Sequence, residues 1–309
     1  MAKTALLFAG QGAQVVGMGR DLAEAHSTAK SLFAEADEAL GYGLSEICFS
    51  GPEEELVRTE HAQPAIYLVG WIALKLLREQ APSISFEATA GLSLGEFTAL
   101  AAADAIGFED GLHVVRRRGE LMQDAYEASS GGMAAIVGLD EEAVRGVCEQ
   151  AGVSLANLNC PGQIVLSGDA DKMDAACEAA KAAGAKRAIP LPVAGAYHSP
   201  LMQPSQAGLA EALAKVELRE PSVPVYSNVT GQAHVGAASI AGTMVDQVTS
   251  SVRWEACIRA MIADGVTRFI ELGPGTALTG FMRRIDRGLE VLNVADNDSL
   301  AKSAEALNA

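Results

Sequence analysis

The sequence is poor in cysteine, and the placement of its few cysteines excludes two classes of protein. Only 5 of the 309 residues are cysteine, and no two of them form a Cys-x-x-Cys pair. An odd, scattered set of thiols does not build the disulfide framework of a small secreted domain, and it lacks the spacing of a zinc site. We therefore expect reduced cysteines in a cytoplasmic protein, and no metal.

Basic charge is also scarce. Lys and Arg number 23 against 39 Asp and Glu, so the formal net charge is −16. A surface of this sign repels nucleic acids and anionic membranes, and neither is expected as a partner. The longest apolar run, residues 65–77, is broken by Lys75 and is too short for a membrane span. The apolar start of the chain stops at Gln11, which favours a buried first strand over a signal peptide.

What the chain does contain is an alternation of short apolar runs with helical patterns. Helical spacing covers residues 65–80 and 208–216. Strands are predicted at 4–9, 83–90, 223–229, 267–272 and 290–294. This alternation predicts an α/β fold with a mostly parallel sheet.

One segment in the middle of the chain breaks the alternation. It reads strand, helix, strand, strand, helix, strand, at 133–139, 141–150, 154–159, 163–168, 171–184 and 187–193. This βαββαβ order is that of a ferredoxin-like unit. We therefore predict a small ferredoxin-like subdomain at 130–198, inserted into a larger catalytic subdomain made of 1–129 and 199–309.

The clearest chemical signal is the stretch Gly91-Leu92-Ser93-Leu94-Gly95. Gly-x-Ser-x-Gly is the pattern of a nucleophile elbow, in which a strand turns abruptly into a helix and holds a serine hydroxyl at the apex. An apolar segment precedes the motif and strong helix formers follow it, as such an elbow requires. The alternative is a tight turn whose serine only caps the helix. The context favours Ser93 as a nucleophile.

A serine nucleophile needs a base, and the chain has only 5 histidines. Those expected on helices, at a helix entry or in a polar loop are His26, His61, His113 and His234. His198 remains, just after a strand at the predicted subdomain boundary, where clefts form. A histidine that only shapes a turn or caps the next helix is the alternative. No acidic residue between Ser93 and His198 stands out as a triad acid, so an amide or a backbone carbonyl is expected to orient the histidine.

Six motifs together resemble one family. In chain order they are FAGQGAQ (8–14), GLSLGE (91–96), VVRRRGELMQ (114–123), NCPGQIVLSG (159–168), GAYHSPLM (195–202) and ELGPGTALTG (271–280). This ordered set spans nearly the whole chain and is similar to the malonyl-CoA:acyl carrier protein transacylases of the stand-alone bacterial type. The resemblance implies an α/β-hydrolase-like large subdomain with a ferredoxin-like insertion.

The resemblance also implies a reaction. A malonyl group passes from malonyl-CoA to Ser93, and from there to the phosphopantetheine thiol of acyl carrier protein, to supply extender units for fatty-acid synthesis. His198 matches the base. The other matched positions are Gln11 and the backbone amide of Leu94 at the oxyanion hole, Gln247 as the amide that orients the histidine, and Asn159 and Gln163 beside the site. No cofactor is implied, because the coenzyme A thioester is a substrate.

Recognition of malonyl requires a partner for its free carboxylate, and a guanidinium can bind it with two hydrogen bonds. Arg116, Arg117 and Arg118 follow one another on a predicted helix. Arg117 points away from the apolar stripe of that helix, whereas Arg116 and Arg118 flank it. The resemblance selects Arg118. In related polyketide acyltransferases, an aromatic residue before the histidine accompanies malonyl, and Tyr197 fits that pattern.

Some alternatives stay open on the sequence. A serine thioesterase or hydrolase uses the same chemistry with water as the acceptor, and a stand-alone acyltransferase of polyketide synthesis uses another carrier protein. A dinucleotide-binding protein is disfavoured, because Val15 stands where the third glycine of Gly-x-Gly-x-x-Gly is needed. Many bacterial members carry histidine where this chain has Leu92. A monomer is expected.

Overall fold

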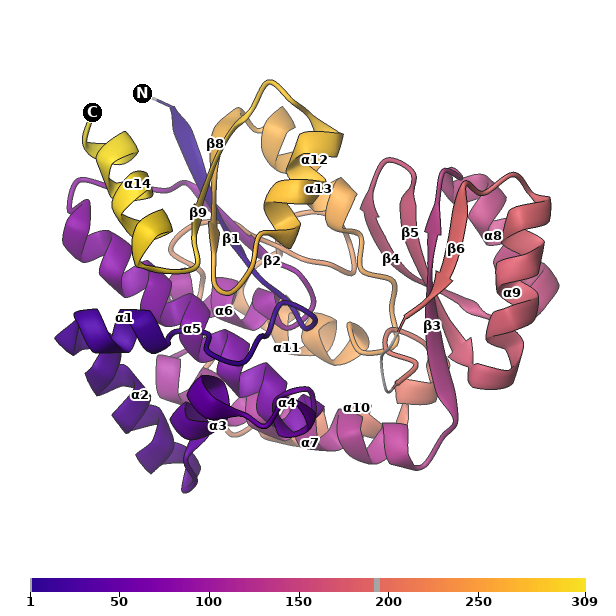
Figure 1. The fold of residues 1–309 in the computed structure, drawn as a ribbon, viewed down its shortest axis with the longest axis horizontal. Coiled ribbons are helices and arrows are strands. Elements are labelled where there is room, and N and C mark those ends of the chain that lie inside the picture. Colours follow the sequence, from indigo (N-terminus) through magenta and orange to yellow (C-terminus); the bar gives the residue numbers. More distant parts are fainter. Residues whose placement is uncertain (1, 192–194) are drawn as a thin grey trace.

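The computed structural model describes residues 2–191 and 195–309, and its larger sheet is entirely parallel (Figure 1). The strand order is β7-β2-β1-β8-β9. The bounds are β1 (Lys3–Phe8), β2 (Ala88–Gly91), β7 (Val225–Tyr226), β8 (Val266–Leu272) and β9 (Glu290–Val294). All five strands overlap predicted ones, and the α/β fold class is confirmed. The predicted strand 83–90 is wrong in its first half, because β2 begins only at Ala88.

Both faces of the parallel sheet are buried, and β1 shows why its sequence is a continuous apolar run. Leu6 and Phe8 belong to one hydrophobic core, and Ala5 and Leu7 to a second. Strand side chains alternate between faces, so each face needs its own apolar set. The first core includes helices α5 (Thr59–Gln80), α6 (Gly95–Ala102) and α7 (Phe108–Glu127), and the second includes α12 (Trp254–Ala263) and α13 (Ala277–Ile285).

The smaller sheet is antiparallel and stands at one end of the molecule (Figure 1). Its order is β4-β5-β3-β6, and helices α8 (Glu141–Ala151) and α9 (Ala170–Ala182) cover one face. The strands are β3 (Gly131–Val137), β4 (Ser154–Cys160), β5 (Gln163–Asp169) and β6 (Arg187–Pro190). This is the predicted βαββαβ order. The predicted end of the last strand, at 193, lies outside the described residues.

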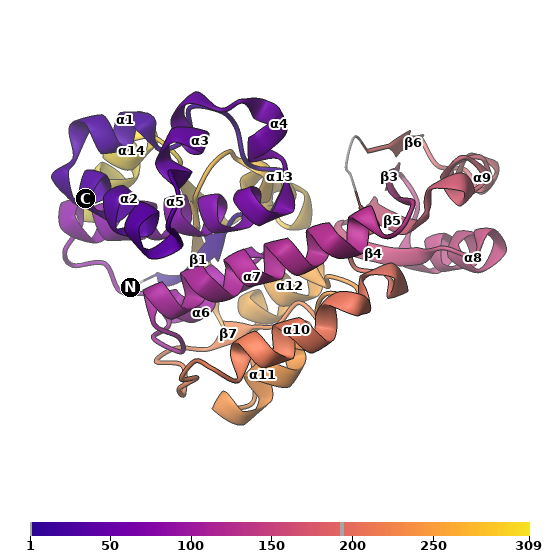
Figure 2. The same cartoon turned by 90° about the horizontal axis from the view of Figure 1, so that it is seen from below.

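The remaining helices pack around the larger sheet. Helices α7 and α10 lie side by side along the underside of the molecule (Figure 2). Pro204 begins α10, which therefore starts four residues before the predicted helix at 208. The other helices are α1 (Arg20–Ala25), α2 (Ser27–Leu40), α3 (Leu44–Ser50), α4 (Glu53–Leu56), α10 (Pro204–Leu213), α11 (Ala237–Asp246), α14 (Asn297–Asn308) and the 3₁₀ turn Pro200–Met202. None of the described helices is long and apolar enough to cross a membrane.

The parallel sheet determines where the site can form. The loops that follow β1, β2 and β7 contain Gln11, Ser93 and Asn228. Because parallel strands end at the same edge of a sheet, these loops meet there, and ligands bind at that edge in open α/β sheets.

Candidate active site

Ser93 occupies a strained turn between β2 and α6. Its φ is 51°, in the left-handed region that residues with a side chain seldom adopt. A Cβ on Gly91 would lie 1.8 Å from the carbonyl carbon of Gly95, and one on Gly95 would lie 2.3 Å from the carbonyl oxygen of Phe8. Neither position therefore has room for a side chain. The two glycines of the motif are what allow strand and helix to meet so closely at the serine.

Side chains from outside the motif hold this turn in place. Asn228 accepts a hydrogen bond from the amide of Ser93 (2.6 Å) and donates one to the carbonyl of Gly91 (2.8 Å). Gln247 donates from Nε2 to the carbonyl of Ser93 (3.1 Å). Both peptide groups of Ser93 are thereby anchored, which offsets the cost of the strained φ.

His198 lies beside the serine hydroxyl, with Nε2 2.8 Å from Ser93 Oγ. Its Nδ1 is 2.9 Å from the backbone carbonyl of Gln247. A carbonyl can only accept, so Nδ1 carries the proton and Nε2 is free to accept from the serine. Burial and, to a smaller extent, the positive charge of Arg118 together lower the pKa of His198 to about 4. The imidazole is therefore neutral at physiological pH, as a base must be.

Arg118 is the buried member of the arginine run, 1% exposed, whereas the side chains of Arg116 and Arg117 are 38% and 47% exposed and pair with Glu120. Its Nη2 donates to Ser93 Oγ (3.1 Å). Burial lowers the pKa of Arg118 to about 10, which leaves the guanidinium charged.

Two glutamines hold the Arg118 guanidinium in place. Gln247 Oε1 accepts from Nη2 (3.0 Å) and Gln63 Oε1 accepts from Nη1 (2.7 Å). Nε is buried and has no partner among the described residues. The guanidinium is thus positioned but not fully satisfied.

The other predicted residues fall into two groups. Tyr197, which precedes His198, is buried, and burial raises its pKa to about 12 against a smaller, opposite effect of Gln11. Leu94 precedes α6, so its amide is one of those at a helix start that have no acceptor within the helix. Asn159 and Gln163 lie on β4 and β5, and no hydrogen bond joins either of them to Ser93, His198 or Arg118 in the described residues. The Oδ1 atom of Asn159 is buried without a partner there.

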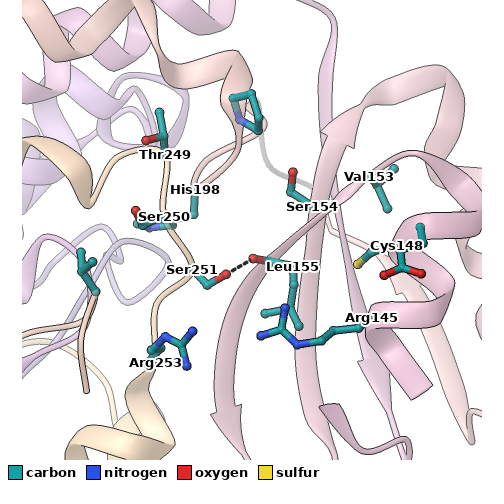
Figure 3. Close-up of a pocket in the computed structure, with 13 residues that line it drawn as sticks. Arg145, Cys148, Val153, Ser154, Leu155, His198, Thr249, Ser250, Ser251 and Arg253 are labelled. Carbon is teal, nitrogen blue, oxygen red and sulfur yellow. Dashed lines mark hydrogen bonds between the residues drawn. The ribbon is translucent and has the colours of Figure 1, made fainter. Parts of the chain in front are cut away.

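The segment that orients His198 connects the two sheets. Val252 donates to the carbonyl of Ala156 in β4 (2.7 Å) and accepts from Leu158 (2.9 Å). Residues 249–251 and His198 line a cavity of about 550 Å³ next to this junction (Figure 3). The position of His198 therefore depends on the contact between the segment after α11 and the edge of the smaller sheet.

Sequence reasoning missed part of the site. Asn228, Gln63 and Glu96 contact the predicted residues directly but carried no predicted role. Glu96 ends the GLSLGE motif, so its position was the one available signal. His234 lies outside any helix or strand, as predicted, but its side chain is 1% exposed and pairs with Glu96, which the sequence did not indicate. No three His, Cys, Asp or Glu side chains in residues 2–191 and 195–309 gather as metal ligands.

Comparisons with known proteins identify the family of the chain. The model of the acyl transferase domain family matches residues 5–302. A malonyl CoA-acyl carrier protein transacylase of Bacillus subtilis is 45% identical, over 99% of this chain and 98% of that protein. The solved structure of a malonyl CoA-acyl carrier protein transacylase from Coxiella burnetii superposes with a TM-score of 0.96 at 35% identity, and covers 100% of this chain and 98% of that one.

A third similar protein was solved with a partner. It is a malonyl-transacylase in complex with a type II PKS acyl-carrier protein, with a TM-score of 0.95 and 38% identity, and the match covers 99% of this chain and 100% of that one. The family match, the full-length identity and the shared fold all point the same way. The chain belongs to the acyl transferase domain family and, within it, to the malonyl CoA-acyl carrier protein transacylases.

Proposed function

We propose that this protein transfers malonyl from malonyl-CoA to the phosphopantetheine thiol of an acyl carrier protein in fatty-acid synthesis, through a malonyl ester on Ser93. His198 takes the proton of the Ser93 hydroxyl as the serine attacks the thioester carbonyl, and then returns it to the departing coenzyme A thiolate. In the second half-reaction it takes the proton of the carrier thiol as the sulfur attacks the malonyl ester carbonyl, and it returns that proton to Ser93 Oγ as the ester bond breaks. One imidazole serves both directions because Nε2 is its only free nitrogen.

The observation that carries the proposal is the short distance between Arg118 and the nucleophile. Arg118 Nη2 lies 3.1 Å from Ser93 Oγ. In malonyl-CoA a single methylene separates the carboxylate from the thioester carbon. A carboxylate held by this guanidinium therefore brings the thioester carbon next to Oγ, whereas a longer diacid would carry it past. The amides of Leu94 and Gln11 are the proposed donors to the oxyanion that forms.

Intact mass tests the covalent step. Brief exposure to malonyl-CoA should add one malonyl group to the wild-type protein and none to Ser93→Ala. Addition of holo acyl carrier protein should remove the group and place it on the carrier. If the malonyl group leaves the protein as fast without carrier protein as with it, water is the acceptor and the protein is a hydrolase. If Ser93→Ala retains the added mass, the nucleophile lies elsewhere.

We also propose where the carrier protein docks. Four basic side chains line a cavity of about 760 Å³ between the smaller sheet and α12, and they outnumber its three carboxylates, Asp140, Glu141 and Glu255. The basic residues are Lys186, Arg253, Arg259 and Arg284, of which Arg259 pairs with Glu255. Because the whole chain has a net charge of −16, an acidic carrier needs such a local basic surface. Lys186→Glu with Arg284→Glu should raise the KM for carrier protein and leave malonyl loading unchanged. An unchanged KM would place docking elsewhere.

We infer that the enzyme works in the cytoplasm. All five cysteines are free and buried. Burial raises the pKa of every one of these thiols, so they stay protonated and unreactive. Thiols of this kind are typical of proteins in a reducing compartment.

A further inference from the structure

Glu96 is a fully buried carboxylate directly behind the nucleophile, and the proposed reaction gives it no role. It is 0% exposed and lies in the first turn of α6, three residues after Ser93. Three donors reach it. His234 Nε2 donates to Oε1 (2.8 Å), and the backbone amide of Asn228 (3.0 Å) and Gln247 Nε2 (2.7 Å) both donate to Oε2. A buried carboxylate is tolerated only when its oxygens are satisfied in this way.

Two of these donors belong to the residues that hold the reacting groups. Asn228 anchors the amide of Ser93, and Gln247 anchors its carbonyl. The backbone of Gln247 also orients His198, and its side chain accepts from Arg118. One carboxylate therefore bonds to the backbone of Asn228 and the side chain of Gln247, the two residues that together contact Ser93, His198 and Arg118.

We propose that Glu96, held by His234, is a positioning residue for acyl transfer. It acts through hydrogen bonds: Oε2 fixes Asn228 and Gln247, and these fix the serine and the histidine. The inference rests on the proposed function, because positioning has meaning only if Ser93 reacts. The negative charge of Glu96 also acts on Arg118 and raises the pKa of its guanidinium. A role as counter-charge is therefore the rival explanation.

A second buried glutamate, in the larger sheet, provides a matched control. Glu271 is the next-to-last residue of β8, is 0% exposed, and accepts three hydrogen bonds from the start of α13: Leu278 N (3.0 Å), Thr279 N (2.8 Å) and Thr279 Oγ1 (2.6 Å). It matches Glu96 in burial and in bond number. It touches none of the residues that contact Ser93 in the described part of the chain.

Conservative substitutions separate hydrogen bonding from charge. In Glu96→Gln the amide oxygen can accept from Asn228 and Gln247 in place of Oε2, and the amide nitrogen can donate to Nε2 of a neutral His234. Glu96→Asp keeps the charge, but its side chain is one methylene shorter and cannot reach all three donors. We expect malonyl loading at saturating malonyl-CoA to fall about 100-fold in Glu96→Asp, as for a 1 Å misplacement of a reacting group. In Glu96→Gln the loading rate should fall less than about tenfold, because the hydrogen bonds and hence the positions of the reacting groups are kept.

The control variants Glu271→Asp and Glu271→Gln should lower the thermal midpoint and leave the loading rate unchanged. All four variants are also treated with a fluorophosphonate, which labels an activated serine whatever acyl group the enzyme uses. The same ranking in labelling supports positioning even if the wild type loads no malonyl, an outcome that would refute the proposed function alone. If the loading rate and the labelling rate of Glu96→Asp equal or exceed those of Glu96→Gln, Glu96 acts by its charge and the inference is overturned. The inference is also overturned if the Glu271 variants lose as much loading rate as the Glu96 variants that show the same drop in thermal midpoint.

Discussion

Ser93 has two differently built surroundings. On one side, here called the inner side, Asn228, Gln247 and Glu96 hold it through hydrogen bonds made within the protein. On the other side, here called the cleft side, it contacts Arg118, whose guanidinium has only part of its hydrogen bonds satisfied. Asn228, Gln247 and Glu96 leave no buried side-chain nitrogen or oxygen without a partner in the described residues. On the other side, Arg118 Nε is buried without one. Native proteins seldom leave such atoms unpaired away from functional positions.

The difference separates two tasks within one site. A satisfied network has one low-energy arrangement, so it can keep a strained serine in place through the whole reaction. An incompletely satisfied guanidinium gains more from an incoming carboxylate than one already paired with an acid, because no ion pair has to be broken first. Damage to the inner side should therefore slow every acyl group alike, whereas damage to the cleft side should change which acyl group reacts.

The largest loss is expected where the two sides meet, at His198. His198→Ala removes the base from the hydroxyl 2.8 Å away and should slow transfer by about 10²–10⁴-fold, the usual contribution of a general acid–base group. Because the same nitrogen serves both half-reactions, malonyl loading and malonyl transfer to the carrier should fall together. Rapid quenching followed by intact mass measures each half separately. If only one half slows, a second base must act in the other.

Arg118→Ala should have the next largest effect, and that effect should depend on the acyl group. A charge-assisted pair is worth about 1.5–3 kcal/mol, so kcat/KM for malonyl-CoA should fall by about 10–150-fold relative to that for acetyl-CoA. Arg118→Lys keeps the charge but loses the fork and should recover only part of the preference. Glu96→Asp is the matched inner-side variant, and its malonyl-to-acetyl ratio should equal that of the wild type. Equal falls for both thioesters in Arg118→Ala would make the arginine structural.

The contrast between the two sides also explains what could be predicted from the sequence. Periodicity and order along the chain predicted the α/β alternation and the βαββαβ segment, because both are local patterns. Ser93 was recognisable because its two glycines are neighbours in sequence. The division of the chain at 129 and 198, and the roles of the site residues, stay predictions.

The inner side escaped prediction for a physical reason. Asn228 falls in the predicted strand 223–229 and His234 in a stretch that reads as a polar loop, and only the packing of the segment after β7 against α6 reveals that Glu96 is buried there. A buried polar network leaves no periodic trace in the sequence, because each member is satisfied by a residue more than 100 positions away. By contrast, the short-range signal of Pro204 at the start of α10 was available.

The smallest expected effect concerns the acid limb of the pH profile, which links the two sides through charge. The ordinary pKa of 6.5 for histidine is lowered to about 4 at His198, first by burial and then by the positive charge of Arg118. A base must be neutral, so the rate of acetyl loading from acetyl-pantetheine, which has no group that titrates in this range, should stay level from pH 8 to about 5 and be halved near 4. In Arg118→Ala one of the two causes is gone, so the midpoint should move upward but stay below 6.5, because burial remains.

Folding stability depends on pH in the same direction as the rate. The stability that His198 contributes is complete above pH 6.5 and is lost as the pH falls through about 4. Thermal midpoints recorded in the same buffers show where the protein stays folded, and rates are compared only there. Equal acid midpoints in the two proteins would mean that Arg118 does not tune the base, and that the cleft side acts on the substrate alone.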